Sequence, residues 1–232
     1  MTNNKIYNSK EGYNIIAPFY DTWKWQSFWH KNEYPFIEKW CNTLNIGQGI
    51  DLGTGSGNNL KCFLSKGHHI NAIDISEKMI ALCKKKYPNN PLLNCTVMDI
   101  HHLPFFERKY DWILSNRVFA HIKDLDSIIK ILSRIIKFGG QCFISDLHPL
   151  HNYQYTNYTI ENGEEVYIET YKHSINNIET LFFENNFEII KCKSFTKTDL
   201  INQDLKDFPK LQLQNTPIFY YYILKYKGNN SI

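Results

Sequence analysis

The segment GIDLGTGSG, residues 49–57, joins an apolar run to three closely spaced glycines. The apolar run at residues 47–52 predicts a strand, and residues 58–66 predict a helix that Gly67 ends. Glycines let the backbone turn tightly and approach a ligand with no side chain in the way. The helix behind them begins with free N–H groups. The segment therefore predicts a ligand-binding turn between a strand and a helix.

The same alternation of strand and helix continues on the carboxyl side of this turn. Helices are predicted at residues 77–87, after Ser76 as the N-cap, and at residues 125–137, before the Gly139-Gly140 pair. The strands of this region are expected at residues 69–74, 93–99, 110–116 and 141–147. Strands separated by helices predict a parallel sheet with helices on both faces, and such sheets bind ligands at the carboxyl ends of their strands.

The rest of the chain is expected to complete this sheet. The alternation breaks at residues 149–174, which are polar and rich in tyrosine, and resumes with a helix near 175–185. Strands are predicted again at residues 188–195 and 218–227. Together these elements predict an α/β, Rossmann-like fold with a mostly parallel, seven-stranded sheet and helices on both faces.

We expect residues 1–232 to form a single domain, because no linker or internal repeat divides the sequence. Residues 1–12 are expected to be a mobile polar start. The remaining parts are an N-terminal aromatic helical lid, a ligand-binding core, a substrate-cap insertion and the C-terminal part of the sheet, at residues 13–44, 45–148, 149–174 and 175–232.

The glycine spacing distinguishes this turn from two common phosphate-binding turns. A dinucleotide fingerprint reads G-x-G-x-x-G, whereas residue 58 is Asn and the spacing here is G-x-G-x-G. A P-loop would require Gly-Lys-Ser/Thr, which does not follow. Asp51, directly before the turn, opposes a pyrophosphate and suits a ligand that bears an ammonium group. These features argue against an NAD-dependent oxidoreductase.

Two further acids end the next two predicted strands. Asp74 follows Gly53 by 21 residues, the spacing at which an acid accepts hydrogen bonds from a ribose diol. Asp99 ends the third strand and suits an adenine amino group, with Ile75 and Ile100 gripping the faces of the ring. An ordinary strand-to-helix turn explains the glycines alone, but not three acids at three successive strand ends.

The segments GIDLGTGSG, AIDIS, VMDIHHLPF, YDWILSN and IKFGGQCFISDLHP resemble, in order, the motifs of the class I S-adenosylmethionine (SAM) dependent methyltransferase family across residues 47–146. The resemblance implies that Asp51 and Gly53 face the methionine part of SAM, Asp74 the ribose, and Asp99 with Ile100 the adenine. S-adenosylhomocysteine (SAH) would be the product. The full set of cofactor-binding residues expected is Tyr13, Tyr20, Asp51, Gly53, Thr54, Gly55, Asp74, Ile75, Met79, Asp99, Ile100 and Asn116.

The N-terminal segment YNIIAPFYD, residues 13–21, is similar to the entry segment of small-molecule methyltransferases in this family. In those proteins a tyrosine there closes over the SAM carboxylate, which makes Tyr20 the first candidate and Tyr13 the second. Plain core packing is the alternative for both. Asn116, at the end of the fourth strand, is placed by the resemblance beside the methyl group, and a role as a turn residue is its alternative.

Histidines supply the candidates for a general base, because imidazole titrates near neutral pH. His148 and His151 follow the fifth strand, and His121 and His173 are further candidates. Loop or scaffold roles are the alternatives, and positioning alone can suffice because the sulfonium is already activated. Asp146, His148 and His151 fit a cation in some geometries, but no second cluster accompanies them and we predict no metal.

The sequence thus predicts an enzyme that moves the methyl group of SAM to an O, N or C atom of a small metabolite. An RNA or protein methyltransferase and a catalytically idle SAM-binding module are the alternatives. A net charge of +3 and the lack of a basic module argue against nucleic acid. Six cysteines without a C-x-x-C pair, no signal peptide and no long apolar run predict a cytoplasmic protein without a membrane segment. The oligomeric state stays open.

Overall fold

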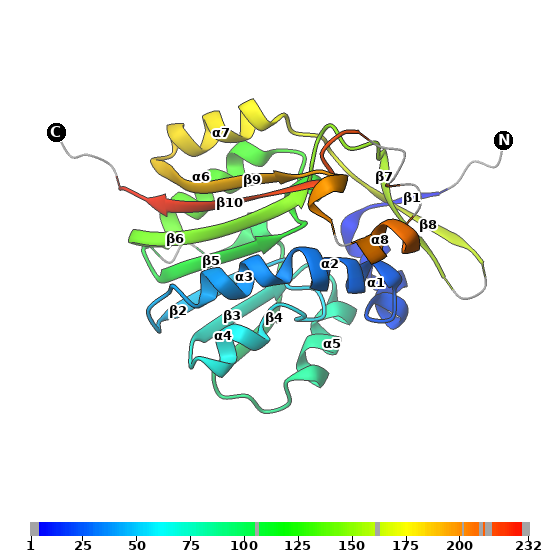
Figure 1. Ribbon diagram of the computed structural model, residues 1–232. Coiled ribbons are helices and arrows are strands. Elements are labelled where there is room, and N and C mark those ends of the chain that lie inside the picture. Colours follow the sequence, from blue (N-terminus) through cyan, green and yellow to red (C-terminus); the bar gives the residue numbers. More distant parts are fainter. Residues whose placement is uncertain are drawn as a thin grey trace.

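The structure is a computed structural model that describes residues 5–104, 107–160, 163–200, 202–208, 211 and 215–228. Its central sheet has seven strands in the order β4-β3-β2-β5-β6-β10-β9 (Figure 1). The strands are β2 Gln48–Leu52, β3 His69–Asp74, β4 Leu93–Val97, β5 Tyr110–Asn116, β6 Ile136–Leu147, β9 Phe187–Phe195 and β10 Phe219–Tyr226. The first five pair in parallel, and β10 is antiparallel to both of its neighbours. The predicted fold class is confirmed.

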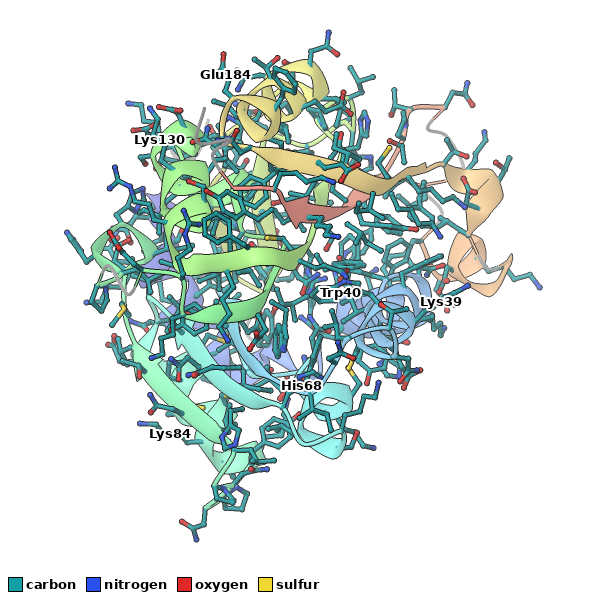
Figure 2. All side chains as sticks on the ribbon, turned by 90° about the vertical axis from the view of Figure 1, so that its left-hand side faces the viewer. Lys39, Trp40, His68, Lys84, Lys130 and Glu184 are labelled. Atoms are coloured by element: carbon teal, nitrogen blue, oxygen red, sulfur yellow. The ribbon has the colours of Figure 1, made fainter. Side chains whose placement is uncertain are left out.

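Helices cover both faces of this sheet, and each face has its own apolar core (Figure 1). On one face lie α6 Leu125–Ile135 and α7 Ile175–Glu184. On the other lie α2 Lys24–Asn32, α3 Tyr34–Cys41, α4 Lys61–Ser65 and α5 Glu77–Lys86. Figure 2 shows Trp40 of α3 turned inward, and its ring lies 5.5 Å from that of Phe143 on β6. The aromatic series of the N-terminal segment therefore supplies much of the second core.

A second, three-stranded sheet was not predicted. It has the order β1-β8-β7, from β1 Ile6–Tyr7, β8 Glu165–Glu169 and β7 Tyr155–Thr159. Helix α1 Ser9–Tyr20 packs between this sheet and α5, through Ile16, Ile168 and Met79. The expectation of a mobile start at residues 1–12 is wrong for β1 and α1, because Asn8 caps α1 and β1 pairs in parallel with β8. Residues 1–4 lie outside the described residues.

Several boundaries differ from the predicted ones. The helix after the glycine turn begins at Lys61, because residues 53–60 form turns first. Helix α6 ends at Ile135, and the Gly139-Gly140 pair lies inside β6 instead of ending the helix. Short 3-10 helices lie at Ile100–His102 (η1), Phe119–His121 (η2) and Lys197–Asp199 (η3), and α8 covers Asn202–Asp207. Among the described residues, no helix has the length and apolar character needed to cross a membrane.

One buried histidine couples the stability of this fold to pH. The Nδ1 atom of His68 accepts hydrogen bonds from Trp112 Nε1–H at 3.0 Å and from the Gly47 N–H at 3.2 Å. Burial lowers the pKa of His68 below 6.5. The folded state therefore holds a neutral imidazole, whose contribution to stability is complete above pH 6.5 and is lost as pH falls below that value.

We expect a His68→Asn variant to lose part of this pH dependence, because the amide oxygen of Asn accepts hydrogen bonds but does not titrate. A single group changes the free energy of unfolding by at most about 1.4 kcal/mol per pH unit. Denaturant unfolding near pH 7.5 and pH 5.5 measures the difference in each protein. An equal loss in the variant and the wild type would assign the pH dependence to other histidines.

Candidate active site

The glycine turn projects from the carboxyl end of β2. Gly53 and Gly55 have φ values of +67° and +55°, which L side chains rarely adopt. A Cβ atom at Gly53 would also lie 2.5 Å from Cγ2 of Val118. Asp51 is buried below the turn, and burial raises its pKa to about 7. Its Oδ2 atom, like Oγ1 of Thr54, has no hydrogen-bond partner among the described residues.

Asp74, the last residue of β3, links that strand to the glycine turn after β2 by a hydrogen bond. Its Oδ2 atom accepts from the Gly55 N–H at 2.8 Å, and its Oδ1 atom accepts from the Ser76 N–H at 2.9 Å. Burial raises the pKa of this carboxyl group. Ser76 then caps α5 by accepting from the Met79 N–H. The carboxylate is therefore fixed in place before any ligand contacts it.

Asp99 fixes the backbone that follows β4. It caps η1 by accepting from the His101 N–H, and His101 Nδ1 lies 2.8 Å from its Oδ1 atom. Partial burial opposes ionisation, but these hydrogen bonds outweigh it and lower the pKa of Asp99. Asp99 is thus a carboxylate at neutral pH, with hydrogen-bond acceptor capacity left at the site.

The strand ends enclose a cavity of about 210 Å³. Residues from α1, α2, η1, η2 and β7 complete its walls. The structure brings most of the predicted site residues to this cavity, namely Tyr13, Tyr20, Gly53, Gly55, Asp74, Ile75, Asp99, Ile100, Asn116 and His121. Residues far apart in the sequence therefore converge on one site, as the ligand-binding edge of a parallel sheet requires.

Three predicted cofactor residues do not line the cavity. Asp51 and Thr54 lie buried under the turn, and Met79 packs in the core beneath α1. Asp51 and Thr54 remain close to the cavity through Gly53 and Gly55. Met79 is fully buried by apolar neighbours, so its side chain supports α1 and α5.

Three of the predicted catalytic histidines, namely His148, His151 and His173, also do not line the cavity. The chain turns back after β6, where His148 N–H donates to the Ile218 carbonyl and His148 Nδ1 accepts from the Leu150 N–H. His151 is buried nearby, and burial, reinforced by Lys172 and His148, lowers its pKa to about 4. The ring of His173 lies 2.7 Å from the Ile122 carbonyl oxygen, outside the cavity.

The carboxylate of Asp146, two residues before His148, already accepts hydrogen bonds from backbone N–H groups. Asp146 accepts from the Ala120 N–H at 2.8 Å and from the Leu147 N–H at 2.7 Å. Burial raises its pKa to about 6. Within the described part of the chain, no group of three His, Cys, Asp or Glu side chains is placed to hold a metal ion.

His121 reaches the cavity together with a tyrosine from α1. Tyr13 Oη lies 2.9 Å from His121 Nε2, and His121 Nδ1 lies 2.9 Å from the Glu169 carbonyl oxygen. A carbonyl only accepts, so Nδ1 carries the proton and Nε2 accepts from the Tyr13 hydroxyl. Burial lowers the pKa of His121, which keeps the ring neutral at neutral pH.

The sequence reasoning missed four other cavity residues that carry chemistry. Trp23 and Trp29 lie in the segment predicted only as an N-terminal aromatic lid, and Tyr158 lies in the predicted cap insertion. Arg117 follows Asn116 at the end of β5 and has a φ of +57°, unusual for a bulky residue. A charged residue directly after a strand end is a usable sequence signal, whereas the approach of Tyr158 depends on the unpredicted second sheet.

Asp74 gives the first mutational prediction. We expect Asp74→Ala to weaken SAH binding by about 1–3 kcal/mol, because a fixed acceptor is lost from the site. Calorimetric titration with SAH measures this change, and thermal unfolding checks that the variant is folded. Asp126→Ala, which removes an exposed acid on α6, is the matched control. Unchanged affinity in Asp74→Ala would remove this carboxylate from the ligand site.

Comparison with known proteins shows what this part of the chain is similar to. Residues 50–144 match the family model described as a methyltransferase domain. The demethylmenaquinone methyltransferase of Thermotoga maritima is 28% identical over 115 residues, which cover 49% of each chain. The chain thus spans about half the length of this curated relative, and less of the next two.

Solved structures show the same fold. A SAM-dependent methyltransferase from Clostridium acetobutylicum aligns with a TM-score of 0.70 at 20% identity, covering 93% of this chain and 99% of that one. Phosphoethanolamine N-methyltransferase 2 from Haemonchus contortus, solved with SAM, aligns with a TM-score of 0.66 at 17% identity, covering 85% and 53%. Residues 50–144 of the chain are therefore similar to a methyltransferase domain, and the chain has the fold of SAM-dependent methyltransferases.

The residues present fit SAM, the methyl donor of this domain class. The glycine turn leaves space that a side chain would fill, and the buried Oδ2 atom of Asp51 lacks a partner within the described chain. Asp74 and Asp99 present acceptors along the same edge of the sheet. The set combines acceptors that suit an ammonium group, a ribose diol and an adenine amino group.

Proposed function

We propose that the protein transfers the methyl group of SAM to an O, N or C atom of a small-molecule acceptor. The observation that carries this proposal is the Tyr13–His121 hydrogen bond in the wall of the cavity that Asp74 and Asp99 also line. Bound SAM supplies an electrophilic methyl group and leaves as SAH. Asp51, Gly53, Gly55, Asp74 and Asp99 would hold it, and α1, α2 and β7 would cover the acceptor.

Tyr13 and His121 form a path for the proton that an O–H or N–H acceptor releases. The acceptor proton passes to Tyr13 Oη while the Tyr13 proton passes to His121 Nε2, which is free to take it. Burial raises the pKa of Tyr13 far above 10, so the hydroxyl relays a proton and does not ionise by itself. His121 ends as an imidazolium whose Nδ1–H still donates to the Glu169 carbonyl.

The enclosure of the cavity supports a small acceptor. Tyr13, Tyr20 and Trp23 line it from the N-terminal segment, and Tyr158 lines it from β7. The Trp23 and Tyr158 rings lie 3.9 Å apart and close this side. Aromatic walls of this kind suit a flat or partly apolar compound. The relative from Thermotoga maritima is named for demethylmenaquinone as its acceptor.

A methyl-label experiment tests the proposal. The purified protein receives SAM labelled on its methyl group and a cell extract separated into small molecules, RNA and protein. We expect label in the small-molecule fraction. Label in RNA or protein would show that the acceptor is a macromolecule and not a small molecule. SAH binding without label in any fraction would favour a catalytically idle SAM-binding module.

A further inference from the structure

Arg117 is the only lysine or arginine among the described residues that line the cavity, and the proposed methyl transfer does not use it. Its backbone has a φ of +57°, a conformation that costs a bulky residue free energy and clusters at functional sites. The guanidinium lies 4.8 Å from the Trp29 ring. Trp29 and Arg117 therefore lie side by side in the wall of the cavity.

The countercharge of Arg117 lies behind it, away from the cavity. Glu33 pairs with Arg117 NH1 through Oε2, and its Oε1 atom accepts from Ser145 Oγ at 2.5 Å. Ser145 Oγ in turn accepts from the Asn116 side-chain amide at 2.7 Å. The Glu33 side chain is 2% exposed and does not line the cavity, whereas the Arg117 side chain is 19% exposed and does.

The guanidinium retains N–H groups beyond the one given to Glu33, because it carries five in a planar fork. Such a fork matches the oxygens of a carboxylate or phosphate. The hydroxyl of Tyr158 and the Tyr13–His121 pair line the same cavity and add further polar groups. Asp146, also in the wall, accepts a backbone N–H with each carboxylate oxygen, and the positive charge of Arg117 partly offsets the effect of burial on the pKa of its carboxyl group.

We propose that Arg117 is a specificity residue that binds an anionic oxygen of the acceptor, so that the acceptor class is a small compound carrying a carboxylate, enolate or phosphate group. Glu33 holds the guanidinium in position and moderates its charge. This inference rests on the proposed function of the same cavity, and it predicts a preference for anions over neutral compounds of equal shape.

A pair of flat probes of equal shape tests this preference. Benzoate and benzamide are titrated into the SAH-bound protein by calorimetry. We expect benzoate to bind at least about tenfold more tightly than benzamide in the wild type. Equal affinities, or tighter binding of benzamide, would overturn the proposal. Inorganic phosphate in a third titration distinguishes a phosphate site, at which it would compete with benzoate, from a carboxylate site.

Variants of the ion pair make the test independent of folding. Arg117→Gln alone leaves Glu33 buried without its partner, so the double variant Glu33→Gln/Arg117→Gln removes both charges together. We expect it to bind SAH as the wild type does and to lose the preference for benzoate. Glu33→Gln alone exposes the full charge of Arg117 and should strengthen benzoate binding severalfold.

Lys172→Gln is the matched control, because it removes a positive charge that contacts the His151 carbonyl outside the cavity. It should leave the benzoate preference unchanged. A preference that survives in the double variant, or falls equally in Lys172→Gln, would show that Arg117 is structural. Failure of SAH to bind the wild type would instead contradict the proposed methyl transfer, so the two failures are distinguishable.

Discussion

Replacing His121 with Gln is expected to lower the turnover of an O–H or N–H acceptor by about 100-fold or more, the usual contribution of a general base. Gln keeps a side chain that can hydrogen-bond to Tyr13 but cannot take its proton. The acceptor identified by methyl labelling is the substrate for this assay. Initial rates at saturating SAM measure the loss, and calorimetry with SAH checks that the cofactor site is intact.

Two companion variants make the interpretation specific. Tyr13→Phe removes the hydroxyl that joins the acceptor to His121 and should give a similar loss. His148→Gln changes a histidine that the structure places outside the cavity, and it should leave turnover close to the wild-type value. The reverse pattern, with His148 essential and His121 dispensable, would restore the sequence-based assignment of His148 as the base.

The pH profile gives an independent readout of the same residue. Burial lowers the pKa of His121 below 6.5, so its neutral, proton-accepting form persists to lower pH than that of a free histidine. The acid limb of kcat/KM should therefore lie below pH 6.5 in the wild type. An acid limb at or above pH 6.5 would mean that a group other than His121 controls this part of the pH profile.

The core of this fold follows directly from the sequence because its signals are local. The glycine turn, Asp74 and Asp99 each end an apolar run, and parallel strands bring such ends to one edge of the sheet. The same reasoning predicted that residues from this edge would meet, and the cavity contains most of them. Their contacts with SAM and the acceptor stay predictions until the binding experiments are done.

The acceptor side depends on contacts that no local pattern encodes. The N-terminal helix α1 meets the site because Ile16 packs against a sheet formed in part by residues after β6. The direction of the chain after β6 placed His148 near Ile218, whereas a short 3-10 helix placed His121 against Tyr13. Of the four candidate histidines, the structure places His121 in the wall of the cavity and His148, His151 and His173 outside it, and the catalytic role stays a prediction.

Gly49 shows how closely the cofactor turn depends on packing deeper in the sheet. It pairs with Trp112 on the neighbouring strand β5, and a Cβ atom at this position would lie about 2 Å from the atoms of the indole ring. The ring has no room to yield. Trp112 is fully buried, is stacked on Phe63 with 4.3 Å between ring centroids, and donates to His68.

Gly49→Ala is therefore expected to lower the free energy of unfolding by about 3 kcal/mol or more, the upper range for overpacking a rigid core. Denaturant unfolding at neutral pH measures the loss. Gly47→Ala is the comparison variant, because a Cβ atom there would meet the Asp111 carboxylate, which can shift only at the expense of its hydrogen bonds to the Gln48 N–H and Lys137, and a smaller loss of about 1–2 kcal/mol is expected. SAH binding should weaken only in Gly49→Ala, since β2 carries the glycine turn and β5 carries Asn116. Similar stabilities of the two variants would mean that Trp112 can shift, and that the turn is set by its own glycines rather than by the sheet beneath it.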